Sequence, residues 1–247
     1  MAMTVLLNLL FPEETRPPAT EPRLETDSQK IESIVAVHGI FGDPWSLSYL
    51  VKDLKGDNRS LINWGYPSTE KKIQEHGADL VRILTPLAEK NPGKPIHFVG
   101  HSMGGLVIRA ALNHPDCPKE AKIGKAVLLG TPNRSPAWGK FLSQYEIFRE
   151  LGGVAGRQLM SEYEEEIGDL PETVDALVIA GNLSFNWLIP EDNDGTVGVS
   201  ETFLKTPHRH VILHTGHKTM LIDERVREIV KDFLIPLKNG KNCKLFS

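Results

Sequence analysis

Short apolar runs of strand length recur along this chain, and segments with helical spacing separate them. The first run is IESIVAV at residues 31–37, and five more follow at 61–64, 95–100, 125–130, 176–180 and 209–213. A continuous apolar run of this length is typical of a strand that is buried on both faces, as in a parallel sheet. The pattern therefore predicts an α/β fold with a mostly parallel central sheet of at least six strands and helices on both faces.

Amphipathic helices are expected between these runs. Residues 69–90 carry apolar side chains on one face, and Asn91-Pro92-Gly93 is expected to end that helix. Residues 226–234 place apolar side chains at i, i+3, i+4, i+7 and i+8, and Pro236 follows them. A shorter helix is expected over 46–54. A chain of 247 residues suits one such domain, which we assign to residues 31–240.

Two segments depart from this alternation. Residues 4–11 are apolar (TVLLNLLF), and the proline-rich residues 12–30 that follow them are typical of an extended linker. Residues 133–174 form a stretch longer than a simple crossover needs, with many aromatic and aliphatic side chains interrupted by glycines. This stretch predicts either a small helical cap or a crossover helix with a surface insertion.

Composition narrows the class of partner and cofactor. The chain has 28 basic and 32 acidic residues, a net charge of −4, and no basic block, which argues against a nucleic-acid partner. Its two cysteines, Cys117 and Cys243, are far apart and lack the spacing of a metal site, so we expect free thiols and no metal or cofactor.

Location is not fixed by the sequence. No stretch approaches the roughly 20 apolar residues that a membrane helix needs. Residues 4–11 have no preceding lysine or arginine and no small-residue cleavage site after them, which slightly favours a cytoplasmic location over export. Peripheral contact of this segment with a membrane or lipid surface stays open.

Residues 95–112 (PIHFVGHSMGGLVIRAAL) suggest the chemistry. An apolar run changes to helical spacing at Gly100-His101-Ser102-Met103-Gly104, which places G-x-S-x-G at a strand-to-helix bend. A serine at the apex of such a tight turn has a strained backbone, and glycines on either side avoid steric clashes. Ser102 is therefore the candidate nucleophile.

Acyl transfer also needs two N–H donors where the carbonyl oxygen becomes an anion. One is expected from the backbone of Met103, which follows the serine. The other is expected from Ile40, in the loop HGIFG that follows the strand at 31–37. His38 in that loop is expected to form structural hydrogen bonds rather than to catalyse.

A serine nucleophile requires a base, and the base requires an acid, in the order Ser, Asp or Glu, His in doubly wound hydrolases. Asp194 follows the strand at 176–180 and is preferred to Asp192 as the acid. His217 lies in the loop after the last strand and is preferred as the base. The rival histidines near that strand are His208, His210 and His214.

Five segments in this order resemble the α/β-hydrolase superfamily, in particular small bacterial lipase-like serine esterases. They are VAVHGIFGDPW, FVGHSMGGLVIR, LLGTPNRSP, NDGTVGVSET and HTGHKTML, and they cover roughly residues 31 to 235. The resemblance implies a carboxylic ester hydrolase with Ser102 as nucleophile, Asp194 as acid and His217 as base, acting on a small ester or lipid-like substrate.

The resemblance leaves three points open. Relatives often have a glycine after the asparagine of LLGTPN, whereas this chain has Arg134. Some secreted lipases carry a structural calcium; Asp192 and Asp223 could contribute, but no full ligand set is evident, so no metal is expected. The same triad would also serve a thioesterase, an amidase or an acyltransferase, and a non-catalytic binding protein can share the fold.

Overall fold

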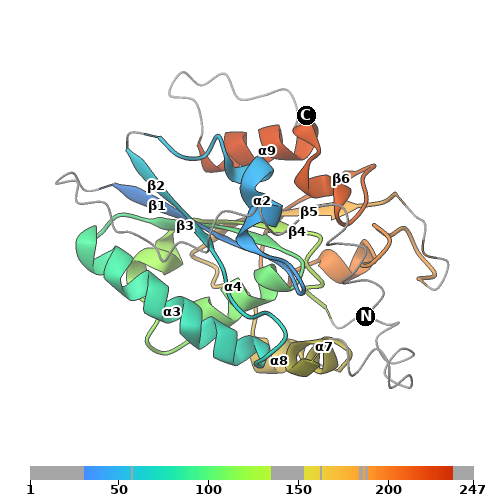
Figure 1. Ribbon diagram of the computed structural model, residues 1–247, viewed down its shortest axis with the longest axis horizontal. Helices are drawn as coiled ribbons and strands as arrows, with labels where there is room; N and C mark the ends of the chain where they lie inside the picture. Colours follow the sequence, from blue (N-terminus) through green and yellow to red (C-terminus); the bar gives the residue numbers. More distant parts are fainter. Residues whose placement is uncertain are drawn as a thin grey trace, which may run out of the picture.

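The computed structural model describes residues 31–56, 58–134, 153–161, 163–183, 186 and 189–235. Its strands are β1 (Glu32–Val37), β2 (Arg59–Trp64), β3 (Ile96–His101), β4 (Lys125–Leu129), β5 (Asp175–Gly181) and β6 (Arg209–Leu213). They form one six-stranded sheet in the order β2-β1-β3-β4-β5-β6 (Figure 1). Every pairing between these strands is parallel. The predicted fold class is therefore confirmed.

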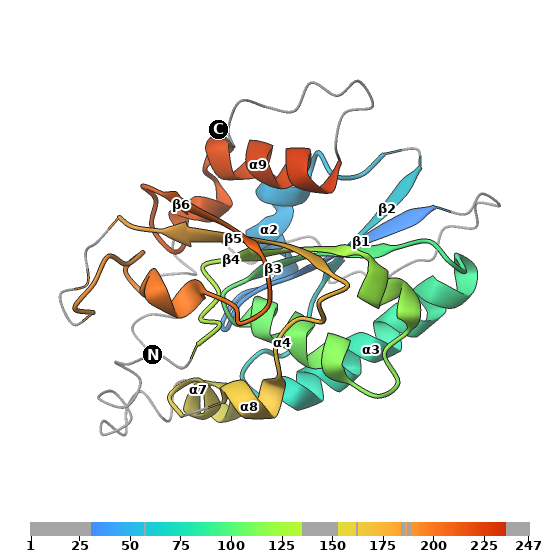
Figure 2. The same ribbon diagram turned by 180° about the vertical axis from the view of Figure 1, so that it is seen from behind.

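Helices cover both faces of the sheet (Figures 1 and 2). One face packs against α3 (Ile73–Lys90) and α4 (Met103–Asn113), and the other against α2 (Pro44–Val51) and α9 (Glu224–Leu234). Successive strand residues alternate between the two hydrophobic clusters, so Val35 belongs to the first and Ile34 to the second. This double burial explains why the inner strands are nearly continuous apolar runs.

Some helix boundaries differ from the sequence prediction. The helix expected from residue 69 begins at Ile73, because a turn with a Glu70 N–H to Pro67 C=O hydrogen bond precedes it. The Glu75 carboxylate accepts from the Lys72 N–H at 2.8 Å and satisfies one of the free donors at this terminus. At α2, Asp43 is the cap and Pro44 the first helical residue, which moves the start two residues before Ser46.

Strand order brings the candidate residues to one edge. The chain places β2 on one side of β1 and all later strands on the other, so the order reverses between β1 and β3. In open α/β sheets, ligands bind at the carboxyl ends of the strands beside such a reversal. The loop after β1 and the turn after β3 are neighbours there, because Val37 pairs with Gly100.

Several predictions lie outside the described residues, namely the segments at 1–30 and 135–152, Pro236 and Cys243. The described part of 133–174 includes two short helices, α7 (Gly153–Leu159) and α8 (Glu164–Ile167). The Val154 N–H donates to the Thr69 C=O at 2.9 Å, which joins α7 to the segment before α3. In the part of the chain that the structure describes, no helix is both long and apolar enough to cross a membrane.

Candidate active site

Ser102 stands between β3 and α4 with φ 54° and ψ −128°. This left-handed backbone is uncommon for any residue but glycine and is maintained by its surroundings. The Ser102 N–H donates to the Leu129 C=O at 2.8 Å, which fixes the turn to the end of β4. A Cβ at Gly104 would overlap the Val37 carbonyl oxygen, and one at Gly100 would lie 2.7 Å from the Gly105 Cα. Glycine is therefore required by space on both sides of the serine.

The loop after β1 lies directly against this turn. A Cβ at Gly39 would be 2.9 Å from the Ser102 Cβ. Phe41 also has a left-handed backbone, with φ 58°, and its N–H donates to the Ser68 hydroxyl at 3.0 Å. Among the described residues, no acceptor is found for the Ile40 N–H. Met103 is the first residue of α4, and the N–H groups of a first helical turn have no partner within the helix.

Asp194 and His217 meet at the same edge. The Asp194 Oδ2 accepts from the His217 Nδ1 at 2.7 Å, and the His217 N–H donates to the Asp194 C=O at 2.8 Å. The other carboxylate oxygen accepts from the N–H groups of Thr196 and Val197, at 2.9 and 2.7 Å. Since the carboxylate accepts at Nδ1, the neutral His217 imidazole keeps its Nε2 lone pair free for a proton.

Two glycines provide the room for this pair. Gly130 follows β4 with φ 50°, and a Cβ there would lie 2.9 Å from the Asp194 Oδ2 and 3.0 Å from the His217 Nδ1. Gly181 ends β5, where a Cβ would lie 2.8 Å from the Asp194 Cβ. The ends of β4 and β5 thus pack directly against the Asp194–His217 pair.

The rival residues have other environments. Asp192 is exposed, whereas Asp194 is 4% exposed. Each rival histidine has its own polar neighbour: His208 contacts the Thr206 C=O, His210 the Thr202 hydroxyl and His214 the Asn182 side chain. Of these four histidines, His217 is the one that contacts Asp194.

His101, which precedes Ser102, connects this turn to the loop of His217. The His101 Nε2 donates to the His217 C=O at 2.9 Å, and the two rings have centroids 4.7 Å apart. Within the described residues, no hydrogen bond joins the Ser102 hydroxyl to the His217 ring. Such bonds are often long in unliganded enzymes and tighten when substrate binds.

The sequence interpretation missed His101, although it is part of the motif. Its contact partner is 116 residues away in the chain, so no local pattern indicates it. Burial, with the nearby charge of His217 adding to it, lowers the pKa of His101 to about 3. A neutral His101 therefore supports the backbone of the loop that carries His217.

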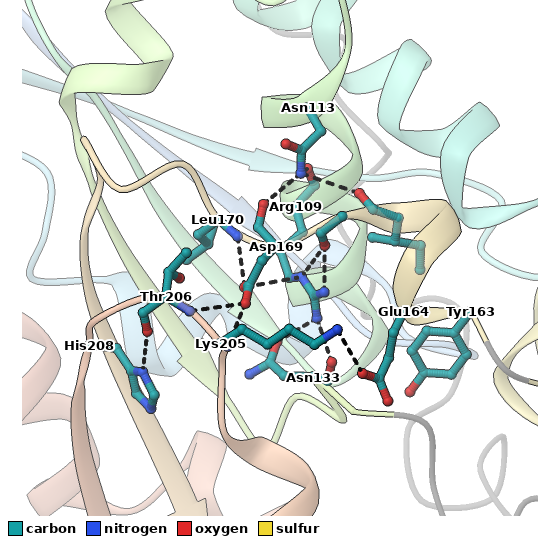
Figure 3. A network of polar contacts seen from close by, with 12 residues as sticks. Arg109, Asn113, Asn133, Tyr163, Glu164, Asp169, Leu170, Lys205, Thr206 and His208 are labelled. Atoms are coloured by element: carbon teal, nitrogen blue, oxygen red, sulfur yellow. Dashed lines mark hydrogen bonds and ion pairs between the residues drawn. The ribbon is translucent and has the colours of Figure 1, made fainter.

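A buried arginine is the centre of a second polar network (Figure 3). Arg109, on α4, is 3% exposed and donates to the Asn133 C=O at 2.8 Å and to the Gly168 C=O at 2.9 Å. Asn133 donates in turn to the Thr202 C=O at 2.6 Å. Arg109 therefore links α4 to the segments on both sides of residues 135–152 and to the short helix η3 (Ser200–Thr202).

Asp169 extends the network. Its carboxylate accepts from the Leu170 N–H at 2.8 Å and the Thr206 N–H at 3.1 Å, and it lies 4.0 Å from the Arg109 guanidinium. The buried charge of Arg109 is thus satisfied by carbonyl oxygens and one carboxylate, as buried charges require. Sequence reasoning did not single out either residue.

The candidate metal ligands and the described cysteine have other surroundings. The described residues contain no group of three or more His, Cys, Asp or Glu side chains that could hold a metal ion. Asp223 instead caps α9, accepting from the Arg225 N–H at 3.0 Å. Cys117 is buried as a free thiol, and burial raises its pKa to about 11. A thiol with such a pKa is a poor nucleophile at neutral pH.

Comparison with solved structures finds similar folds. The mature form of the lipase BlEst2 from Bacillus licheniformis is 19% identical, with a TM-score of 0.64 over 85% of this chain and 94% of that chain. The lin2722 gene product of Listeria innocua is 17% identical, with a TM-score of 0.58 over 87% and 97%. The esterase EaEST from Exiguobacterium antarcticum is 16% identical, with a TM-score of 0.51 over 82% and 91%.

At these identities the likeness establishes the fold alone. No curated protein sequence matches the chain. The sequence profile of the Alpha/beta hydrolase family, however, matches residues 34–232, which include the turn at Ser102 and the contact between Asp194 and His217. The chain therefore belongs to the alpha/beta hydrolase family.

Proposed function

We propose that this protein is a serine hydrolase that cleaves carboxylic esters through an acyl-enzyme on Ser102. The observation that carries the proposal is the strained Ser102 turn at the same sheet edge as the buried 2.7 Å contact between Asp194 and His217. Two of the similar structures are described as a lipase and an esterase, which favours esters as the substrate class.

In the proposed first step, the Ser102 Oγ attacks the ester carbonyl carbon while the His217 Nε2 takes the hydroxyl proton. The carbonyl π electrons move to its oxygen. That oxyanion accepts hydrogen bonds from the N–H groups of Ile40 and Met103. Asp194 holds the imidazole in the required tautomer and stabilises its protonated form.

The intermediate then collapses. The bond between the acyl carbon and the alcohol oxygen breaks, and the imidazolium of His217 gives its proton to the leaving alcohol. Water attacks the acyl-enzyme in the second half of the cycle, with His217 taking its proton. Collapse releases the carboxylic acid and returns a proton to the Ser102 oxygen.

The proposed substrate is a small ester or a lipid-like ester. Two aromatic side chains are about half exposed here, at 53% for Phe41, within the proposed oxyanion loop, and 50% for Trp45, three residues after it. Apolar surface near the proposed oxyanion loop favours an apolar acyl or alcohol group over a charged one. Thioesters and amides are alternative substrates for the same groups.

A set of p-nitrophenyl esters from acetate to palmitate tests the proposal, with Ser102→Ala as the control. We expect hydrolysis by the wild-type protein, none above background by Ser102→Ala, and a fluorophosphonate adduct that peptide mapping assigns to Ser102. An adduct on another serine, or a folded wild-type protein that neither reacts nor hydrolyses, would refute the mechanism and favour a binding protein with this fold.

A further inference from the structure

The peptide between Gly39 and Ile40 is held at one end by two donors. The Gly39 C=O accepts from the Gly42 N–H at 3.0 Å and from the His38 Nδ1 at 2.9 Å. In a planar trans peptide, the C=O and the following N–H point in opposite directions. Fixing the Gly39 oxygen therefore fixes the direction of the Ile40 N–H.

The His38 ring is itself fixed by Tyr66. The Tyr66 N–H donates to the His38 Nε2 at 3.4 Å, and the Tyr66 hydroxyl donates to the His38 C=O at 2.8 Å. The two rings stack with centroids 4.5 Å apart and an interplanar angle of 23°. With 1% of its surface exposed, His38 has no freedom to turn away from Gly39.

These contacts require one form of the ring. A carbonyl oxygen can only accept, so Nδ1 carries the proton, and a backbone N–H can only donate, so Nε2 is unprotonated. The neutral Nδ1–H tautomer satisfies both. Burial lowers the pKa of His38, although its hydrogen bond to Gly39 acts in the opposite direction. The lowered pKa keeps the ring in this neutral form at neutral pH.

The surrounding loop gives a reason for this support. Gly39 has no side chain to restrain its peptide, and Phe41, two residues on, has the strained φ of 58°. A peptide that rotated by half a turn would present the Gly39 oxygen instead of the Ile40 N–H to a developing oxyanion. That arrangement would repel the transition state instead of stabilising it.

We propose that His38 is a positioning residue of the oxyanion hole, whose Nδ1–H holds the Gly39 carbonyl and so aims the Ile40 N–H at the reacting carbonyl oxygen. The inference rests on the proposed function. This positioning role differs from simple packing in the core because it depends on one ring nitrogen. The Nδ1–H is required to stabilise the transition state, because it holds the Gly39 carbonyl, whereas Nε2 only contacts Tyr66.

Two variants separate the ring nitrogens. The side-chain amide of His38→Asn can place an N–H near the position of Nδ1, whereas that of His38→Gln reaches the position of Nε2. We expect His38→Gln to lower kcat by about 10²- to 10³-fold, as removal of one oxyanion donor does, with KM nearly unchanged. His38→Asn should retain most of the wild-type kcat. Thermal unfolding by circular dichroism checks that both variants fold.

Nitrogen NMR on the wild-type protein gives a readout that needs no turnover and no variant. We expect the Nδ1–H tautomer of His38. A wild-type protein that is inactive toward every ester refutes the proposed function. An active wild type with the Nε2–H tautomer, or equal kcat losses in the folded Asn and Gln variants, overturns the role of His38.

Discussion

Around Ser102 the backbone of β1 fills the available space, whereas Asp194 and His217 are held mainly by hydrogen bonds. A Cβ at Gly104 would overlap the Val37 carbonyl oxygen, so the turn and β1 touch with no side chain between them. Asp194, by contrast, is fixed through its carboxylate, which accepts from one histidine ring and two backbone N–H groups.

This difference predicts how the Ser102 turn and the Asp194–His217 pair respond to substitution. Where two backbone segments are in contact, an added methyl group cannot be accommodated without a shift of the backbone. Where polar side chains make the contacts, an isosteric change keeps the shape and loses the chemistry. A side chain added beside Ser102 should therefore affect stability, and an isosteric change of Asp194 should affect turnover in a folded protein.

The largest effect is expected from Asp194→Asn. The amide keeps the volume of the carboxylate but cannot hold the His217 tautomer or stabilise its charged form, so kcat should fall by about 10⁴-fold, as for the equivalent change in a serine protease. Asp192→Asn is the control and should change kcat by no more than about twofold, the usual range for an exposed site. Kinetics with p-nitrophenyl acetate measure both. A larger loss for Asp192→Asn would transfer the acid role to it.

Gly104→Ala should destabilise the fold most. Because its Cβ would overlap a backbone oxygen, the free energy of unfolding should fall by more than about 3 kcal/mol, at or beyond the usual cost of overpacking. Gly156→Ala in α7 is the matched control, since its Cβ would lie 3.6 Å from the Ile40 Cδ1, an ordinary contact. Helix propensity favours that change by up to about 1 kcal/mol. Urea unfolding measures the difference, and equal effects would disprove the backbone contact.

Arg109→Met tests the network of buried polar contacts around Arg109, which lies apart from the Asp194–His217 pair. The methionine fills much of the volume but leaves the carbonyl oxygens of Asn133 and Gly168 without their donor, which should lower the free energy of unfolding by about 3 kcal/mol. Arg82→Met, at an exposed ion pair, should cost under about 1 kcal/mol. Urea unfolding of the two variants is the measurement. Similar values for both would mean that the network in Figure 3 adds little stability.

The smallest effect concerns pH. The folded-state pKa of His101, about 3, lies below the ordinary value of 6.5, so the unfolded chain binds the proton more tightly. The stability from this group is therefore present above pH 6.5 and is lost as the pH falls toward 3, by up to about 1.4 kcal/mol per pH unit. His101→Gln keeps an N–H donor and removes the titration. Urea unfolding at pH 7, 6 and 5 should show a shallower slope for the variant; parallel slopes would contradict the assignment.

The sequence predicted the elements whose signals are local. All six strands were found within two residues of their ends. The four inner strands are buried on both faces, which makes each an apolar run between turn residues. The strand-to-helix turn at Ser102 was predicted because its motif spans five residues at a strand end. The contact of Asp194 with His217 was anticipated from strand order, since both follow late strands at one edge.

Contacts between distant residues could not be predicted in this way. His38 and Tyr66 are 28 residues apart, and Arg109 and Gly168 are 59 apart. The hydrophobic periodicity of the sequence therefore does not indicate either contact. The start of α3 was misplaced for a related reason. Residues 69–72 share the composition of the helix, but a turn begun at Pro67 and a contact from residue 154 to Thr69 keep them out of it.

The strand order also has a consequence for synthesis of the chain. Both β2 and β3 pair with β1, and each later strand pairs with the one made before it. As the chain emerges from the ribosome, the partner of every strand after β1 has therefore already been synthesised, and no strand depends on a later one for its first pairing. The turn at Ser102 can form early in this sequence. Asp194 and His217 follow the last two strands, so a nascent chain carries its proposed nucleophile well before it can use it.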